Sequence, residues 1–238
     1  MKPNRLLTGA VLFGMALSAY AAPLVRYFEL TTEPERQAAF DAVGVENLST
    51  SVEKEPGTLA MYALHQTDAP NVNYVFEIYQ DDDAYRIHSR SPQFEKFVET
   101  AKTAVVGRKV FETEPHFLYE KSEPLRITDN RPKVNFAEVR VKPEFNAQFK
   151  AVVLDEMQQS MAKEAGVLAM YAVTLKERPN EWRFFEIYAD EQAYRIHRET
   201  PHFRHYLRRT AEMTLDKKVI SLQGGTLMNK GGLRFIRH

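Results

Sequence analysis

The pattern of apolar and polar positions in the C-terminal half of the chain predicts alternating strands and helices. Strands are expected at 133–141, 167–175, 182–188 and near 215–222, and helical stretches at 144–164 and about 190–211. In the first helical stretch, Phe145, Phe149, Val152, Val153 and Met157 recur at helical spacing. The resulting order, β-α-β-β-α-β, is that of the ferredoxin-like unit.

The same pattern occurs twice in the chain. Residues 56–110 align with 165–219 at a constant offset of 109, without a gap, and 22 of the 55 aligned positions are identical. "FEIY" begins at Phe76 and again at Phe185, and "AYRIH" at Ala84 and Ala193. This similarity indicates an internal duplication, with one ferredoxin-like unit in each copy.

Two such units can cover each other. One unit has helices on one sheet face and leaves the other face bare, which a second unit can bury. We therefore expect an α+β fold in which two tandem ferredoxin-like units form an intrachain pseudo-dimeric α+β barrel. Pairing of each copy with a copy in another chain is the alternative.

The N-terminus has the features of a secretory signal peptide. Lys2 and Arg5 precede an apolar run, and Ala19-Tyr20-Ala21 offers small residues at the positions that a signal peptidase reads. We expect a signal peptide over 1–21 and a periplasmic or secreted protein, which the lack of cysteine suits. For the rest of the chain we expect a first ferredoxin-like domain at 22–121, a linker at 122–132 and a second ferredoxin-like domain at 133–223. No regular structure is predicted for the tail at 224–238.

The charge balance and the absence of certain motifs limit the classes of binding partner that we expect. The chain has 32 basic and 32 acidic residues, so nothing favours nucleic acid or an acidic membrane surface, and a small-molecule partner is expected. The sequence has no glycine-rich phosphate loop, nucleophile elbow or dinucleotide fingerprint. These motifs therefore give no support for flavin or nicotinamide binding.

Strand 182–188 carries the first candidate site residues. By alternation, Phe185 and Ile187 share one face, which we expect under the helices. The other face, expected to line the space between the sheets, carries Trp182, Phe184, Glu186 and Tyr188. Glu77 and Tyr79 repeat the last two residues in the first copy. The alternative is that Tyr188 is ordinary core and that Glu186 pairs with an arginine such as Arg195.

Two histidines flank a predicted helix break. The stretch "HRETPHF" runs from His197 to Phe203, and its first-copy counterpart "HSRSPQF" starts at His88. Thr200-Pro201 predicts a helix N-cap followed by proline at the first helical position, as does Ser91-Pro92. His202 then lies in the first helical turn, where the dipole disfavours the imidazolium and leaves a neutral base. Gln93 replaces it in the first copy, so the two copies are not expected to be equivalent.

Metal binding is a rival use of these histidines. His197 and His202 are five residues apart, not the four that place two ligands on one helix face. His205 lies three residues after His202, but no carboxylate partner is evident for them in the sequence. We predict no metal.

The segment "FEIYADEQAYRIHRETPHFRHY", from Phe185 to Tyr206, resembles the antibiotic biosynthesis monooxygenase superfamily, particularly its quinol monooxygenase branch. There an aromatic-Glu strand precedes a helix with His-x-x-Thr/Ser-Pro-His. The resemblance implies paired ferredoxin-like units and oxidation of a quinol or polyphenol by dioxygen without metal or flavin. It implies no cofactor, a small aromatic substrate with dioxygen as partners, and a homodimer as an option.

The resemblance assigns roles to the candidate residues. His197 or His202 would be the catalytic base, with Trp182, Phe184, Glu186, Tyr188 and Tyr194 binding the aromatic ring, and His88, Glu77 and Tyr79 would form a second site. Two alternatives stay open. The chain could be a non-catalytic periplasmic binding or stress-related protein, or an isomerase that uses the same proton abstraction.

Overall fold

A computed structural model describes residues 21–237. Apart from Ala21, the expected signal peptide lies outside this range. The first half contains β1 (Leu24–Thr32), α1 (Gln37–Lys54), β2 (Thr58–Gln66), β3 (Ala69–Tyr79), α2 (Asp82–His88), α3 (Pro92–Ala104) and β4 (Val105–Glu120). The second half contains β5 (Arg126–Ile127), β6 (Lys133–Val141), α4 (Asn146–Lys163), β7 (Val167–Leu175), β8 (Arg178–Tyr188), α5 (Glu191–Glu199), α6 (Pro201–Thr210), β9 (Thr214–Asn229) and β10 (Arg234–Ile236).

The long strands close into one antiparallel barrel. Their order is β1-β3-β2-β9-β6-β8-β7-β4, and β4 completes the ring by pairing with β1. Two 16-residue strands belong to both halves: β4 pairs first with β1 and then with β7, and β9 pairs first with β6 and then with β2. The predicted intrachain pseudo-dimeric α+β barrel is therefore confirmed.

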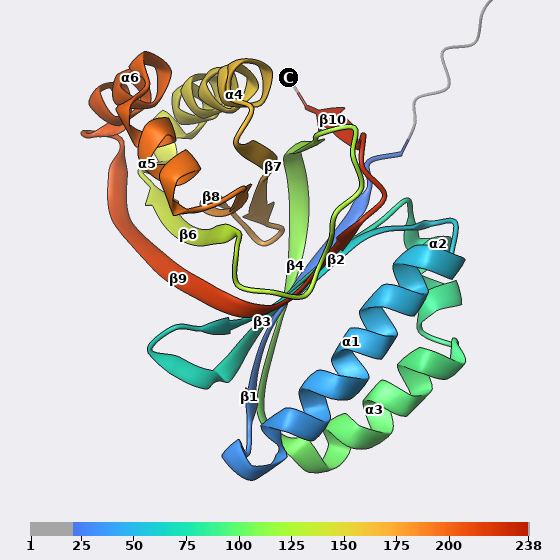
Figure 1. Cartoon of the computed structure of the whole chain (residues 1–238). Coiled ribbons are helices and arrows are strands. Elements are labelled where there is room, and N and C mark those ends of the chain that lie inside the picture. Colours follow the sequence, from blue (N-terminus) through green and yellow to red (C-terminus); the bar gives the residue numbers. More distant parts are fainter. Residues whose placement is uncertain (1–20, 238) are drawn as a thin grey trace, which may run out of the picture.

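The helices cover the outside of the barrel on two sides. Figure 1 shows α1 and α3 beside the first half and α4, α5 and α6 beside the second. Aromatic side chains from both copies fill the barrel interior, where Phe76 stacks on Phe185 with ring centroids 5.1 Å apart. Each half thus has a second core between its strands and its own helices, and the candidate site residues lie in this outer layer.

The segments expected to be a linker and a tail both join the sheet. The linker contains β5, which pairs with β9. The tail supplies the last part of β9, beside β2, and β10, beside β4. The expectation of an unstructured tail misses this because the pairing partner lies in the other half of the chain. Among residues 21–237, no helix is both long and apolar enough to cross a membrane.

Candidate active site

The two faces of β8 are the reverse of the sequence-based expectation. Phe185 and Ile187 point into the barrel interior, whereas Trp182, Phe184 and Tyr188 pack against the helices. Because both faces of β8 are covered, apolar alternation alone does not identify the interior face. The closed interior suits the purely apolar pair, and the face under the helices gives the half-buried Glu186 polar neighbours. Any site built from this strand therefore lies between sheet and helices, not between the sheets.

A large cavity lies in this outer layer of the first half. Its volume is about 600 Å³, which is within the usual range for small-molecule pockets. The aromatic side chains that line it are Phe28, Phe40, Phe94, Phe97 and Tyr85. Its polar and charged lining comprises Asp41, Asn47, His65, Asn73, Glu77, Lys102, Arg108, Thr128 and Thr226. A cavity that combines aromatic side chains with polar groups is suited to a small aromatic ligand that also carries polar substituents.

The equivalent space in the second half is filled. The cavity there is about 60 Å³, room for only one or two water molecules. The difference follows from paired positions 109 residues apart, where the second copy has the larger side chain: Trp182 for Asn73, Phe184 for Val75 and Val153 for Gly44. Trp182 is buried and stacks on Phe184 with centroids 5.9 Å apart. The halves have thus diverged, and the first offers room for a ligand.

His65 is the base candidate in the first-half cavity. Asn73 Nδ2 donates to the Leu30 carbonyl at 3.1 Å, so its Oδ1 accepts from Gln37 Nε2 and His65 Nδ1, each at 2.9 Å. His65 Nδ1 therefore carries the proton, and neutral His65 has its lone pair on Nε2. That atom lies 3.6 Å from Asp41 Oδ2.

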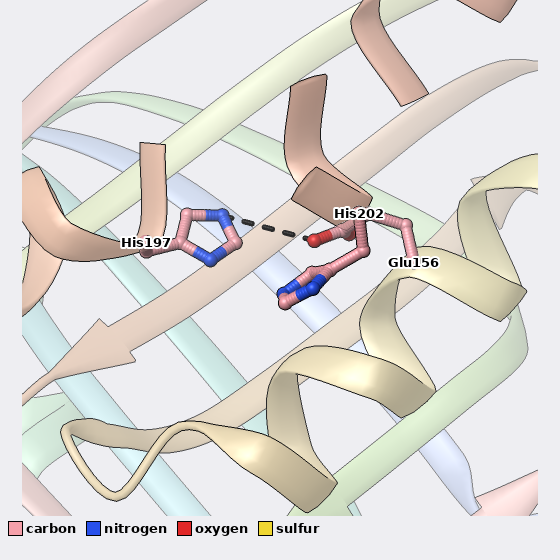
Figure 2. Close-up of side chains that lie close together, drawn as sticks. All are labelled: Glu156, His197 and His202. Carbon is pink, nitrogen blue, oxygen red and sulfur yellow. Dashed lines mark ion pairs between the residues drawn. The ribbon is translucent and has the colours of Figure 1, made fainter. Parts of the chain in front are cut away.

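The predicted catalytic histidines lie in the second half around one carboxylate. Glu164 Oε1 is 3.1 Å from His197 Nδ1 and 2.6 Å from His202 Nε2. On the other side, His197 Nε2 is 3.9 Å from Glu156 Oε1 (Figure 2). The predicted N-caps are confirmed: Thr200 caps α6 and Ser91 caps α3, each before a proline.

These contacts shift the protonation of the cluster. Burial lowers the pKa of His197, but the Glu164 hydrogen bond and the charges of Glu186, Glu156 and Glu164 outweigh it, and the pKa is raised. Burial raises the pKa of Glu164, but its histidine hydrogen bonds bring the pKa below its ordinary value. For Glu156, burial raises the pKa to about 7. The cluster shares protons among closely spaced groups but has little space beside it for a substrate.

The other predicted binding residues of the second half mostly serve packing. Tyr188 donates to Glu186 Oε2 at 2.9 Å, and burial raises the Tyr188 pKa well above its ordinary value. Tyr194 packs on Tyr188 with centroids 5.2 Å apart. The Trp182 indole donates to Asn146 Oδ1 at 2.8 Å. Phe184, Glu186 and Tyr194 line the 60 Å³ cavity.

The first half repeats part of this arrangement. Tyr79 donates to Glu77 Oε2 at 2.9 Å, and burial raises the Glu77 pKa. His88 Nδ1 is 3.2 Å from Glu55 Oε2, and Gln93 Nε2 donates to Glu55 Oε1 at 2.7 Å. Gln93 thus keeps the hydrogen bond made by its histidine counterpart without the ability to titrate. Of these residues, Glu77 lines the large cavity.

Asp41, His65 and Asn73 were not predicted as site residues. The prediction relied on positions that are identical in the two copies, and these three positions differ. The signal was in the differences between the copies. At the matching positions of the second copy stand Lys150, Thr174 and Trp182, so all three polar groups are specific to the first copy.

Fold and cavity together define a tandem ferredoxin-like barrel with a ligand-sized pocket in one half. A family comparison matches the antibiotic biosynthesis monooxygenase model at residues 23–100 and again at 133–209. The chain therefore belongs to the antibiotic biosynthesis monooxygenase family, with two copies of its domain. A comparison with curated proteins finds no match.

Solved structures share the whole tandem arrangement. A candidate monooxygenase from Lactobacillus acidophilus NCFM is 28% identical, with a TM-score of 0.85 over 90% of this chain and 100% of its own. One from Fusobacterium nucleatum is 24% identical, with a TM-score of 0.86 over 92% of this chain and 100% of its own, and supports the fold.

Proposed function

We propose that the chain is a monooxygenase that oxidises a small quinol or polyphenolic aromatic with dioxygen, without a cofactor, in the first-half cavity. The observation that carries the proposal is the 600 Å³ aromatic cavity with His65, whose neutral ring has its lone pair on Nε2, among the residues that line it. Family membership and the similarity to the Lactobacillus acidophilus protein support the reaction class. His65 replaces His197 and His202 as our choice of base because the second half has room only for water.

The residues suit the first step of such a reaction. His65 Nε2 takes the phenolic proton, and Asp41 stabilises the resulting imidazolium. The phenolate is then electron-rich enough to pass electrons to dioxygen. For a quinol the overall reaction adds one oxygen atom to the ring and reduces the other to water, so that quinol plus dioxygen gives hydroxyquinone plus water. The aromatic lining orients the ring and limits water around it.

Oxygen uptake with a panel of hydroquinones, using metal-stripped protein from residue 22 onward, tests the proposal. We expect uptake above autoxidation, reduced by roughly 100-fold or more in His65→Thr, because a positioned base contributes about that factor. Thr is the residue of the second copy at the matching position, Thr174. His205→Gln, at an exposed position of α6, is the control and should retain the rate.

The same experiment separates the alternatives. Loss of uptake in His202→Gln, with a normal rate in His65→Thr, would place the base in the second half. Binding of hydroquinones without uptake would contradict turnover and favour the binding protein or the isomerase.

We also propose that the protein is exported, on the evidence of the signal-like sequence at 1–21. N-terminal sequencing of the protein from a periplasmic extract should find a start at Ala22. An intact Met1 on the bulk of the protein would contradict export.

A further inference from the structure

Three potential metal ligands converge in the second half from three different helices. Glu156 lies on α4, His197 on α5 and His202 on α6, and their ligand atoms all lie within 4.8 Å of one another. Figure 2 shows the two rings and the carboxylate gathered at one point. All three residues are at least nine-tenths buried. The set is not evident from the sequence, because Glu156 lies 41 residues before His197.

Glu164 contacts one ring nitrogen of each histidine. Its Oε1 accepts from His197 Nδ1 at 3.1 Å and from His202 Nε2 at 2.6 Å. With these nitrogens protonated, the free lone pairs are on His197 Nε2 and His202 Nδ1. The first of these is 3.9 Å from Glu156 Oε1, which is longer than a hydrogen bond. A carboxylate that receives the second ring N–H of metal-binding histidines is the usual outer support of such sites.

The first half has the same supporting carboxylate but not the same three potential metal ligands. Glu55 there takes the place of Glu164, and it too is bonded to His88 and Gln93. Two of the three ligand positions differ, with Asn47 in place of Glu156 and Gln93 in place of His202. The second half therefore has two additional ligating side chains at one point, beyond what the shared hydrogen-bond arrangement needs.

More acidic than basic side chains surround the point. Glu156, Glu164 and Glu186 bring three carboxylates into the neighbourhood, and Lys217 is the basic residue that lines the same small cavity. Ligands at about 2.1 Å from a zinc-like ion lie roughly 3.4 Å apart. The ligand atoms lie within 4.8 Å of one another, so binding requires a small movement of the side chains, and the 60 Å³ cavity has room for a water as a fourth ligand.

We propose that Glu156, His197 and His202 bind one divalent transition-metal ion of the zinc class, which fastens α4 to the α5–α6 junction. Two histidines and one carboxylate are typical zinc ligands, and bound metal stabilises the folded state. The site is independent of the first-half cavity and of the activity proposed for it.

Titration of metal-stripped full-length protein with Zn²⁺, in competition with a chromophoric chelator, tests the site. We expect one Zn²⁺ per chain, a rise in the unfolding temperature, and a Co²⁺ visible spectrum of tetrahedral or five-coordinate type. Glu156→Asn with His202→Gln should weaken binding by roughly 100-fold or more and abolish the thermal shift. His205→Gln, a histidine outside the cluster, is the control and should bind normally.

The reciprocal variant tests the ligand assignment. Asn47→Glu with Gln93→His should raise the stoichiometry from one Zn²⁺ to two. The proposal is overturned if the wild type takes up no Zn²⁺, if the second-half variant binds as well as the wild type while circular dichroism shows it folded, or if the reciprocal variant stays at one.

Discussion

At the scale of single residues, the chemistry of each half depends on how buried polar groups are paired. In the first half, Asn73 fixes the proton of His65 on Nδ1, and the lone pair of the neutral ring is on Nε2, 3.6 Å from Asp41 Oδ2. In the second half, Glu164 Oε1 accepts a hydrogen bond from each of two histidines. Where the halves meet, Tyr62 and Tyr171 share a hydrogen bond of 2.5 Å, and Tyr171 donates to Glu120 at 2.8 Å. Burial raises the pKa of Glu120 to about 7.

Glu120 should make stability depend on pH. Between about pH 4.5 and pH 7, the folded state keeps a proton on this carboxyl that the unfolded state releases. The contribution of Glu120 to the free energy of unfolding is therefore fully present below about pH 4.5 and is lost as the pH rises to about 7. The loss amounts to roughly 3 kcal/mol. Glu120→Gln, which keeps an acceptor for Tyr171, should be more stable than the wild type at pH 8 and close to it at pH 4.

Urea unfolding of both proteins at the two pH values measures this effect, and the difference between them removes contributions from other groups. Parallel pH profiles for wild type and variant would show that Glu120 is not the cause.

At the scale of elements, the sequence predicted the order of helices and strands but not which face of a strand is inside. The helix break at Thr200-Pro201 was predictable because an N-cap and a proline are local signals. The orientation of β8 was not, since Phe184 and Phe185 are equally apolar and both faces of the strand are covered. The large cavity was not predictable either, because its polar residues come from several elements that are far apart in the sequence, among them α1, β2 and β3.

The last part of β9, which pairs with β2 of the other half, depends on a glycine pair. Gly224 and Gly225 have positive φ angles of 53° and 127° at a register shift where β9 meets β2. A Cβ at Gly225 would lie 2.0 Å from the Ala63 carbonyl oxygen. Gly225→Ala should therefore lower the free energy of unfolding by roughly 3 kcal/mol or more.

Gly232→Ala is the matched control for Gly225→Ala. Its φ is also positive, at 75°, but nothing lies within 4 Å of the added Cβ, so the loss should be roughly 1 kcal/mol. Chemical denaturation compares the two variants. Equal losses would show that the backbone angle, not the contact with Ala63, sets the cost.

At the scale of the whole molecule, duplication let the two halves of one barrel specialise. The shared features build the fold: interior aromatics, a capped helix break, and a carboxylate under the histidine of each copy. The features that differ carry the proposed functions. Smaller side chains open the first half, while larger ones close the second and two additional ligands gather there. The repeated histidine keeps its contact with a carboxylate in both halves, and the unmatched residues beside it distinguish the halves.

The most direct test of this division is the binding of a hydroquinone under anaerobic conditions, followed by calorimetry, in a variant that fills the first cavity. Asn73→Trp with Val75→Phe introduces the residues that the second half carries at the matching positions, Trp182 and Phe184. We predict one site per chain in the wild type and in the His205→Gln control, and no measurable binding in the filled, folded variant. Unchanged binding in that variant would contradict the assignment of the site to the first half.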